Sequence, residues 1–209
     1  MIEWIIVISL IVLLVVVLVY RTMRFKPSLF PEMKKTHEID EQKVIDSLSK
    51  MIQFETVSNK DPKMVNKKAF KDFQNFLKER YPLIHEKSNL KLFDDALLYH
   101  FKGKNEDQPI VLMAHYDVVP AEGEWLHPPF SGHVDETYIY GRGTLDTKNS
   151  LCAIMEALEY ILLKGKVLKH DVYLAFGSDE ETNGHTAPKI VNYFKEKNIK
   201  PYFVLDEGG

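Results

Sequence analysis

Apolar residues fill the first part of the chain without a polar face. Between Trp4 and Tyr20 the only polar side chain is Ser9, and the rest is almost entirely isoleucine, valine and leucine. A helix over this run is about 25 Å long at ~1.5 Å per residue, close to the ~30 Å hydrocarbon thickness of a bilayer. Trp4 and Tyr20 stand where interfacial aromatic residues occur. The pattern predicts one membrane-spanning helix.

After this run the hydrophobic pattern becomes that of a folded domain. Apolar residues at helical spacing predict two amphipathic helices, one over 44–52 and one over 70–77, the second ended by Tyr81-Pro82. Short apolar runs predict four strands: 96–101, 110–115, 171–177 and 202–206. The last three are continuously apolar, as strands buried on both faces are. Two further helices are expected, over 150–163 and 187–197.

Strands and helices alternate along the chain, which predicts an α/β fold with a largely parallel mixed sheet flanked by helices. We expect three regions: a transmembrane anchor over 1–25, a proline-containing linker over 26–37, and a domain over 38–209. Basic residues follow the apolar run, so the positive-inside rule predicts a single-pass membrane protein whose domain is cytoplasmic.

The composition of the chain limits which partners and which metal ligands can be expected. The net charge is only −3, and the basic residues are dispersed, so nucleic acid is not expected as a partner. Cys152 is the only cysteine, which excludes disulfides and a cysteine-rich metal site. Any metal ion must therefore be bound by histidine, aspartate and glutamate.

Acidic and histidine residues follow three of the predicted strands. His115 and Asp117 follow one strand, Glu180 and Glu181 another, and Asp206 and Glu207 the last. In open α/β sheets this edge is where ligands bind, so the three groups are expected in one crevice.

Each group also has a simpler interpretation. His115 and Asp117 leave an extended backbone on the same face, yet such a pair is often only a surface contact. The sequence Asp179-Glu180-Glu181 is compatible with a solvated acidic loop. Alternatively, one glutamate binds a cation and its neighbour takes a proton from the water bound to it.

The glycine-containing segment YGRGTLDTKNS contains Asp146 just before a predicted helix. Gly141 and Gly143 permit unusual backbone angles, and Asp146 by itself is compatible with a helix cap. The glycine pattern fits neither a dinucleotide-binding nor a GK[ST] phosphate loop.

Four motifs in order carry a family resemblance: AHYDVVPAEGEW, HPPFSGHVDETYIYGRGTLDTKNSL, FGSDEETNGH and VLDEGG. From about Glu38 to Gly209 the chain resembles the di-zinc metallopeptidases of aminoacylase, carboxypeptidase S and succinyl-diaminopimelate desuccinylase. It is most similar to the carboxypeptidase S and N-fatty-acyl-amino-acid hydrolase branch.

The resemblance implies two divalent metal ions, with zinc expected and manganese or cobalt as alternatives. It implies metal ligands at four positions, one imidazole and three carboxylates: His115, Asp146, Glu181 and Glu207. Asp206 is an alternative to its neighbour Glu207. Asp117 would orient the histidine, Glu180 would be the general base, and a cis peptide is expected between Asp146 and Thr147.

The resemblance also implies the function: a metal-dependent hydrolase that cleaves a small peptide or an N-acyl amino acid by metal-activated water. Members of the family continue into a lid or dimerisation domain and supply a further metal-binding histidine. The chain therefore resembles an N-terminal part of such an enzyme, inactive by itself, with a homodimer expected for the full-length form. Two alternatives stay open: an inactive membrane-tethered interaction module, and a structural domain whose carboxylates cap helices.

Overall fold

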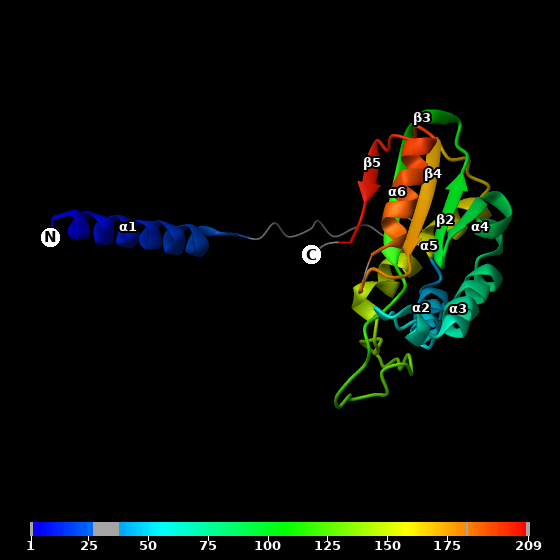
Figure 1. The fold of residues 1–209 in the computed structure, drawn as a ribbon, viewed down its shortest axis with the longest axis horizontal. Coiled ribbons are helices and arrows are strands. Elements are labelled where there is room, and N and C mark those ends of the chain that lie inside the picture. Colours follow the sequence, from blue (N-terminus) through cyan, green and yellow to red (C-terminus); the bar gives the residue numbers. More distant parts are fainter. Residues whose placement is uncertain (1, 27–37, 183, 208–209) are drawn as a thin grey trace. The chain divides into compact units, whose positions relative to one another are not determined.

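The computed structural model describes residues 2–26, 38–182 and 184–207, and the chain divides into two compact units at Ile39/Asp40. Most of the expected linker, 27–37, lies outside the described residues. The first unit contains helix α1 (Ile2–Arg24; Figure 1). The apolar side chains of this helix are all exposed. An 18-residue window of this helix has a mean hydropathy of 3.2, and the helix is long and apolar enough to cross a membrane. A signal sequence near an N-terminus has the same properties.

The second unit, 40–209, is a mixed α/β domain (Figure 1). Its strands are β1 (Asn89–Phe93), β2 (Ala96–Phe101), β3 (Asn105–His115), β4 (His170–Gly177) and β5 (Phe203–Leu205). Its helices are α2 (Glu41–Ile52), α3 (Lys67–Arg80), α4 (Pro82–Lys87), α5 (Asn149–Leu163) and α6 (Thr186–Glu196), with two short helical turns, η1 (Pro62–Met64) and η2 (Thr144–Lys148). The predicted α/β class and every predicted helix and strand are present.

The five strands form one sheet in the order β1-β2-β4-β3-β5. β3 pairs in parallel with β4 and with β5, whereas β1 with β2 and β2 with β4 are antiparallel. The expectation of a largely parallel sheet therefore holds for the half that contains β3, β4 and β5. The other half is an antiparallel hairpin whose first strand, β1, was not predicted, because it has only five residues and contains no run of apolar residues longer than two.

Two apolar layers enclose the sheet. Alternate residues of β2, including Leu97 and Tyr99, pack with β4, α3 and α5 in the larger cluster. The residues between them, such as Leu98, pack with Ile190 and Phe194 of α6 on the opposite face (Figure 1). This period-2 division is what a sheet covered by helices on both faces requires.

Strand β5 differs from expectation in its burial. It was predicted to be buried on both faces, but Phe203, Val204 and Leu205 are each about half exposed. β5 is an edge strand of the sheet and pairs with β3. An apolar run is thus not sufficient evidence for burial, because burial depends on which elements cover the strand.

Candidate metal centre

The parallel half of the sheet determines where the predicted site residues meet. β3 lies between β4 and β5, with His115 opposite Gly177 and Leu112 opposite Leu205. The three strands run in the same direction, so their carboxyl ends lie at one edge. His115 ends β3, Glu180 follows β4, and Glu207 follows β5. The topology therefore brings three distant parts of the sequence together, as expected.

Asp146 reaches the same place from the turn η2, which precedes α5. Gly141 has φ +150° and Gly143 has φ +84°, and both angles favour glycine. The peptide bond between Asp146 and Thr147 is cis, which confirms the geometry that the family resemblance implies. The Asp146 side chain is 70% exposed.

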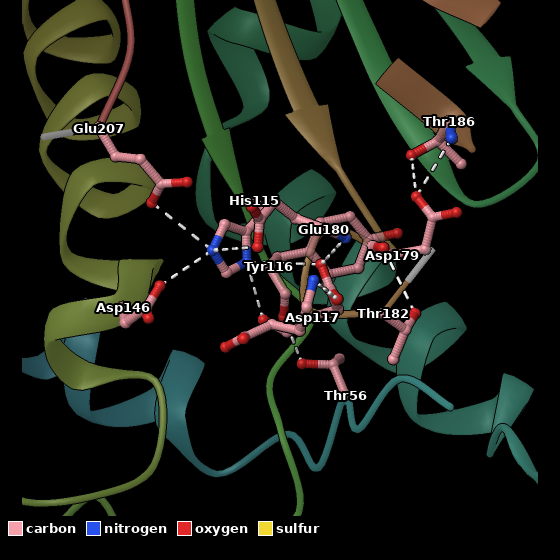
Figure 2. A network of polar contacts seen from close by, with 11 residues as sticks. Thr56, His115, Tyr116, Asp117, Asp146, Asp179, Glu180, Thr182, Thr186 and Glu207 are labelled. Carbon is pink, nitrogen blue, oxygen red and sulfur yellow. Dashed lines mark hydrogen bonds and ion pairs between the residues drawn. The ribbon is translucent and has the colours of Figure 1, made fainter. Parts of the chain in front are cut away.

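The imidazole of His115 is at the centre of the cluster. Its Nε2 lies 3.0 Å from Oδ1 of Asp146, 3.5 Å from Oε2 of Glu207 and 3.8 Å from Oε2 of Glu180 (Figure 2). One ligand atom each from His115, Asp146 and Glu207 lies within 4.8 Å of the others. Side chains from three separate segments thus face one point.

Asp117 holds the His115 imidazole and the two glutamates in place. Its main-chain carbonyl lies 2.9 Å from Nδ1 of His115, which directs the other ring nitrogen toward the carboxylates. Its fully buried carboxylate accepts hydrogen bonds of 3.1 Å from the backbone N–H groups of both Glu180 and Glu181 (Figure 2). One residue therefore fixes the orientation of the imidazole and the position of the glutamate pair, as the residues behind metal ligands do.

The ionisable groups of the cluster shift one another's pKa values. Burial lowers the pKa of His115, but the hydrogen bond and charge of Asp117 and the charge of Glu207 outweigh it and raise the pKa to about 9. Burial raises the pKa of Glu207, and the neighbouring charge of Asp146 raises it further. Burial and the charge of Asp146 likewise raise the pKa of Glu181. The carboxylates thus repel one another, and a cation between them would relieve that repulsion.

The donor set fits a divalent metal ion. One imidazole with several carboxylates suits zinc, manganese or cobalt, and His115 offers Nε2 because Nδ1 is held by a carbonyl. Of the four predicted ligands, His115, Asp146 and Glu207 meet, whereas Glu181 is not part of this group. Glu207 rather than Asp206 faces the imidazole, since Asp206 Oδ1 accepts a hydrogen bond from the backbone N–H of Glu207.

Asp179, the first acid of the triplet, does not face the cluster. Its carboxylate accepts hydrogen bonds from the backbone N–H groups of His185 and Thr186 and from the Thr186 hydroxyl (Figure 2). It therefore closes the turn that carries Glu180 and ties it to the start of α6. The sequence interpretation grouped it with the other two acids, and the signal for its different role is the helix that begins at Thr186.

An α/β domain with an imidazole and several carboxylates at the carboxyl edge of its parallel strands has the architecture of a metallohydrolase. Residues 111–209 match the model of peptidase family M20/M25/M40. This match confirms the family resemblance seen in the sequence.

Two curated relatives illustrate the similarity. The chain is 41% identical over 169 residues to probable carboxypeptidase S-like 2 of Dictyostelium discoideum, covering 77% of this chain and 33% of that protein. It is 36% identical over 177 residues to N-fatty-acyl-amino acid synthase/hydrolase PM20D1 of Xenopus tropicalis, covering 82% and 34%. The chain spans about a third of the length of these relatives.

Solved structures show the same fold at lower identity. Human carnosine dipeptidase 1 has a TM-score of 0.67 at 16% identity, covering 80% of this chain and 38% of that chain. The metallo-carboxypeptidase Sso-CP2 from Sulfolobus solfataricus has a TM-score of 0.61 at 22% identity, covering 82% and 38%.

Proposed function

We propose that this chain provides the metal-binding part of a hydrolase that cleaves an amide bond in a small peptide or an N-acyl amino acid. The observation that carries the proposal is the convergence of His115, Asp146 and Glu207, with Glu180 beside them. The names of the relatives, a carboxypeptidase S-like protein and an N-fatty-acyl-amino acid synthase/hydrolase, support these two substrate classes.

In this proposal His115, Asp146 and Glu207 would hold one divalent ion, and Glu181 would be a ligand of a second. Zinc is expected, and manganese or cobalt would suit the same oxygen-rich ligands. When bound, such an ion polarises the scissile carbonyl and lowers the pKa of water toward ~7. Asp117 holds His115 by its carbonyl, so the imidazole stays aimed at the ion.

Glu180 is proposed as the general base. Its backbone is held by Asp117, while its side chain is 57% exposed and therefore accessible to water and substrate. The carboxylate takes a proton from the attacking water and returns it to the nitrogen of the leaving amine. Glu181 follows directly in the chain, so a single turn provides both a base and a ligand.

The remaining parts of the proposal concern location and organisation. Residues 1–25 are proposed as a single-pass anchor and 26–37 as its linker, with 38–209 as the N-terminal part of a cytoplasmic catalytic domain. The apolar, unburied helix α1 and the basic residues in its last turn, Arg21 and Arg24, support the anchor and its orientation. The homodimer expected of the full-length form remains a prediction.

The decisive experiment measures hydrolysis of dipeptides and N-acyl amino acids by the full-length protein, together with its metal content. Glu180→Gln should reduce kcat by ~10²–10⁴, the usual contribution of general-base catalysis. The control is Glu124→Gln, an exposed glutamate outside the cluster, which should leave kcat unchanged. A Glu180→Gln rate within about tenfold of wild type would exclude this role for Glu180. Metal binding without any hydrolysis would favour the inactive interaction module instead.

A further inference from the structure

Lys148 has a completely buried amino group that the proposed chemistry does not use. It is 0% exposed, and its Nζ donates hydrogen bonds to the carbonyls of Met51, at 3.1 Å, and Phe54, at 2.8 Å. The ammonium also lies 5.4 Å from the centre of the Phe73 ring. Burying an amino group in its charged form is costly, and the two carbonyls that accept hydrogen bonds from Nζ offset part of that cost.

The carbonyl of Met51 lies in the last turn of α2, where a helix carries partial negative charge, and that of Phe54 follows just after the C-cap residue Gln53. A cation fits this place electrostatically. Lys148 is therefore joined to the chain around residues 51–54, although it lies at the beginning of α5. A methionine would fill the same space but would remove the lysine's two hydrogen bonds, and each carbonyl would keep only backbone donors, among them the N–H of Phe54 at Met51 and the N–H of Thr56 at Phe54.

The residues that follow the two carbonyls bound by Lys148 contact the site. The Thr56 hydroxyl donates a 2.5 Å hydrogen bond to the carbonyl of Tyr116, and the N–H of Val118 donates to the carbonyl of Thr56 at 3.0 Å. Figure 2 shows Thr56 beside the segment that carries Asp117. Residues 54–58 thus lie against 116–118, directly after His115.

The other connection of Lys148 is to the turn that carries Asp146. Its backbone N–H donates to the carbonyl of Gly143 at 3.0 Å, which closes the turn around Asp146 and Thr147. Lys148 therefore connects two segments of the site. One presents Asp146, and the other, through residues 51–58, supports His115 and Asp117.

We propose that Lys148 is a positioning residue that holds Asp146 at the correct distance from His115, so that the two can share one metal ion. The proposal rests on the metal-dependent function proposed above. A purely structural lysine would affect only the stability of the domain. A positioning lysine affects metal affinity as well, at temperatures where the variant is fully folded.

The test compares three variants of the full-length protein. Lys148→Met removes the two hydrogen bonds of Nζ and keeps a similar side-chain length. Thr56→Val removes the hydrogen bond from the Thr56 hydroxyl to the carbonyl of Tyr116. The control is Glu159→Gln, on the helix that follows Lys148, because buried Glu159 accepts from two backbone N–H groups, those of Leu83 and Ile84, away from the cluster. The measurements are thermal unfolding in a chelator, zinc affinity by competition with a chromophoric chelator, and the visible spectrum of the cobalt form.

We expect Lys148→Met to bind zinc about tenfold more weakly than wild type and to show an altered cobalt spectrum. Thr56→Val should likewise weaken zinc binding and alter the cobalt spectrum. Glu159→Gln should lose stability while its zinc affinity stays within about twofold of wild type.

A folded Lys148→Met protein with wild-type zinc affinity and cobalt spectrum would overturn the proposal. If Lys148→Met does not fold, Thr56→Val decides: unchanged affinity and spectrum overturn the proposal, and weaker binding with a changed spectrum supports it. A wild-type protein that binds no zinc or cobalt would overturn the proposed function itself. If instead the wild type binds metal and the variants bind it equally well, only the positioning role of Lys148 is overturned.

Discussion

Oδ1 of Asp117 accepts a 3.1 Å hydrogen bond from the backbone N–H of Glu180. A residue at the end of β3 thereby fixes the first residue of the glutamate pair that follows β4. The other carboxylate oxygen accepts from the N–H of Glu181 in the same way. The connection between the two strand ends is thus made by one buried side chain, whose removal has predictable consequences.

Asp117→Ala should weaken both metal binding and hydrolysis. It leaves two partly buried N–H groups without this acceptor, each costing up to about 1–3 kcal/mol, and it releases the turn that carries Glu180. Metal affinity should fall by roughly 10–100-fold, measured by chelator competition. Asp117→Asn is the matched variant, since it keeps an acceptor oxygen, and its loss should be smaller. Equal losses for the two variants would mean that charge, not the hydrogen bonds, is the essential property.

Gly143→Ala should destabilise the domain more than an alanine at another glycine with positive φ. A Cβ at Gly143 would lie 2.6 Å from Cγ1 of Val118, and φ is +84°. The control is Gly165→Ala, at φ +64°, where a Cβ would meet nothing within 4 Å. The backbone strain costs about 1–2 kcal/mol at either position. Overpacking adds about 1–3 kcal/mol at Gly143 alone. Urea unfolding of both variants measures the difference, and equal losses would contradict it.

Much of this architecture was predictable because local patterns and topology agree. The apolar spacing gave the positions of α2, α3 and α5, and the alternation of strands and helices gave the fold class. Parallel strands have their carboxyl ends at one edge, so residues as distant as His115 and Glu207 could be expected to meet.

Other features could not be predicted because they depend on long-range contacts. Lys148 follows Thr147 in a polar stretch, and nothing local indicates that its ammonium is buried against α2. The exposure of β5 depends on what covers it, which an apolar run does not specify. β1 has only five residues, too few for its alternating pattern to stand out from the sequence, and its pairing with β2 defines it.

His85 should make stability depend on pH in mildly acidic solution. Burial lowers its pKa below the usual value of 6.5. Nδ1 lies 3.0 Å from the carbonyl of Tyr81, and Nε2 lies 3.0 Å from the hydroxyl of Tyr99, which suits a neutral ring protonated at Nδ1. As pH falls through 6.5, the unfolded chain binds the proton first, so the free energy of unfolding decreases until the lowered pKa of the folded state is reached. Above pH 6.5 both states are neutral and the contribution is constant.

His85→Gln removes this titration, and the difference in Tm between pH 7.5 and 5.5 should be smaller than in wild type. The control is His185→Gln, since the side chain of His185 is exposed. A His85→Gln protein with the same pH dependence as wild type would show that other groups cause the acid sensitivity.

Leu14→Arg should reduce membrane association if α1 is an anchor. Arginine near the centre of a spanning helix costs about 2.5–3.5 kcal/mol, whereas Leu14→Ile costs almost nothing and is the control. The measurement is the fraction of protein that remains in membranes after alkaline extraction. Mass spectrometry of the mature protein separates the two interpretations of α1, because loss of residues 2–24 would identify a cleaved signal sequence.

Divalent metal should raise the Tm of the domain by a specific amount. Zinc at 100 times its Kd stabilises the folded state by about 2.7 kcal/mol, which is roughly 5–10 °C for a domain of this size. The physical reason is visible at Glu207, whose pKa is raised by burial and by the charge of Asp146, so that a cation relieves a real repulsion. Sodium chloride at matched ionic strength is the control, because screening alone weakens exposed charge interactions without occupying a site. Asp146→Asn should remove most of the zinc effect and little of the salt effect. If zinc and sodium chloride raised Tm equally, the cluster would be an ordinary acidic surface, and the structural domain with helix-capping carboxylates would be the better description.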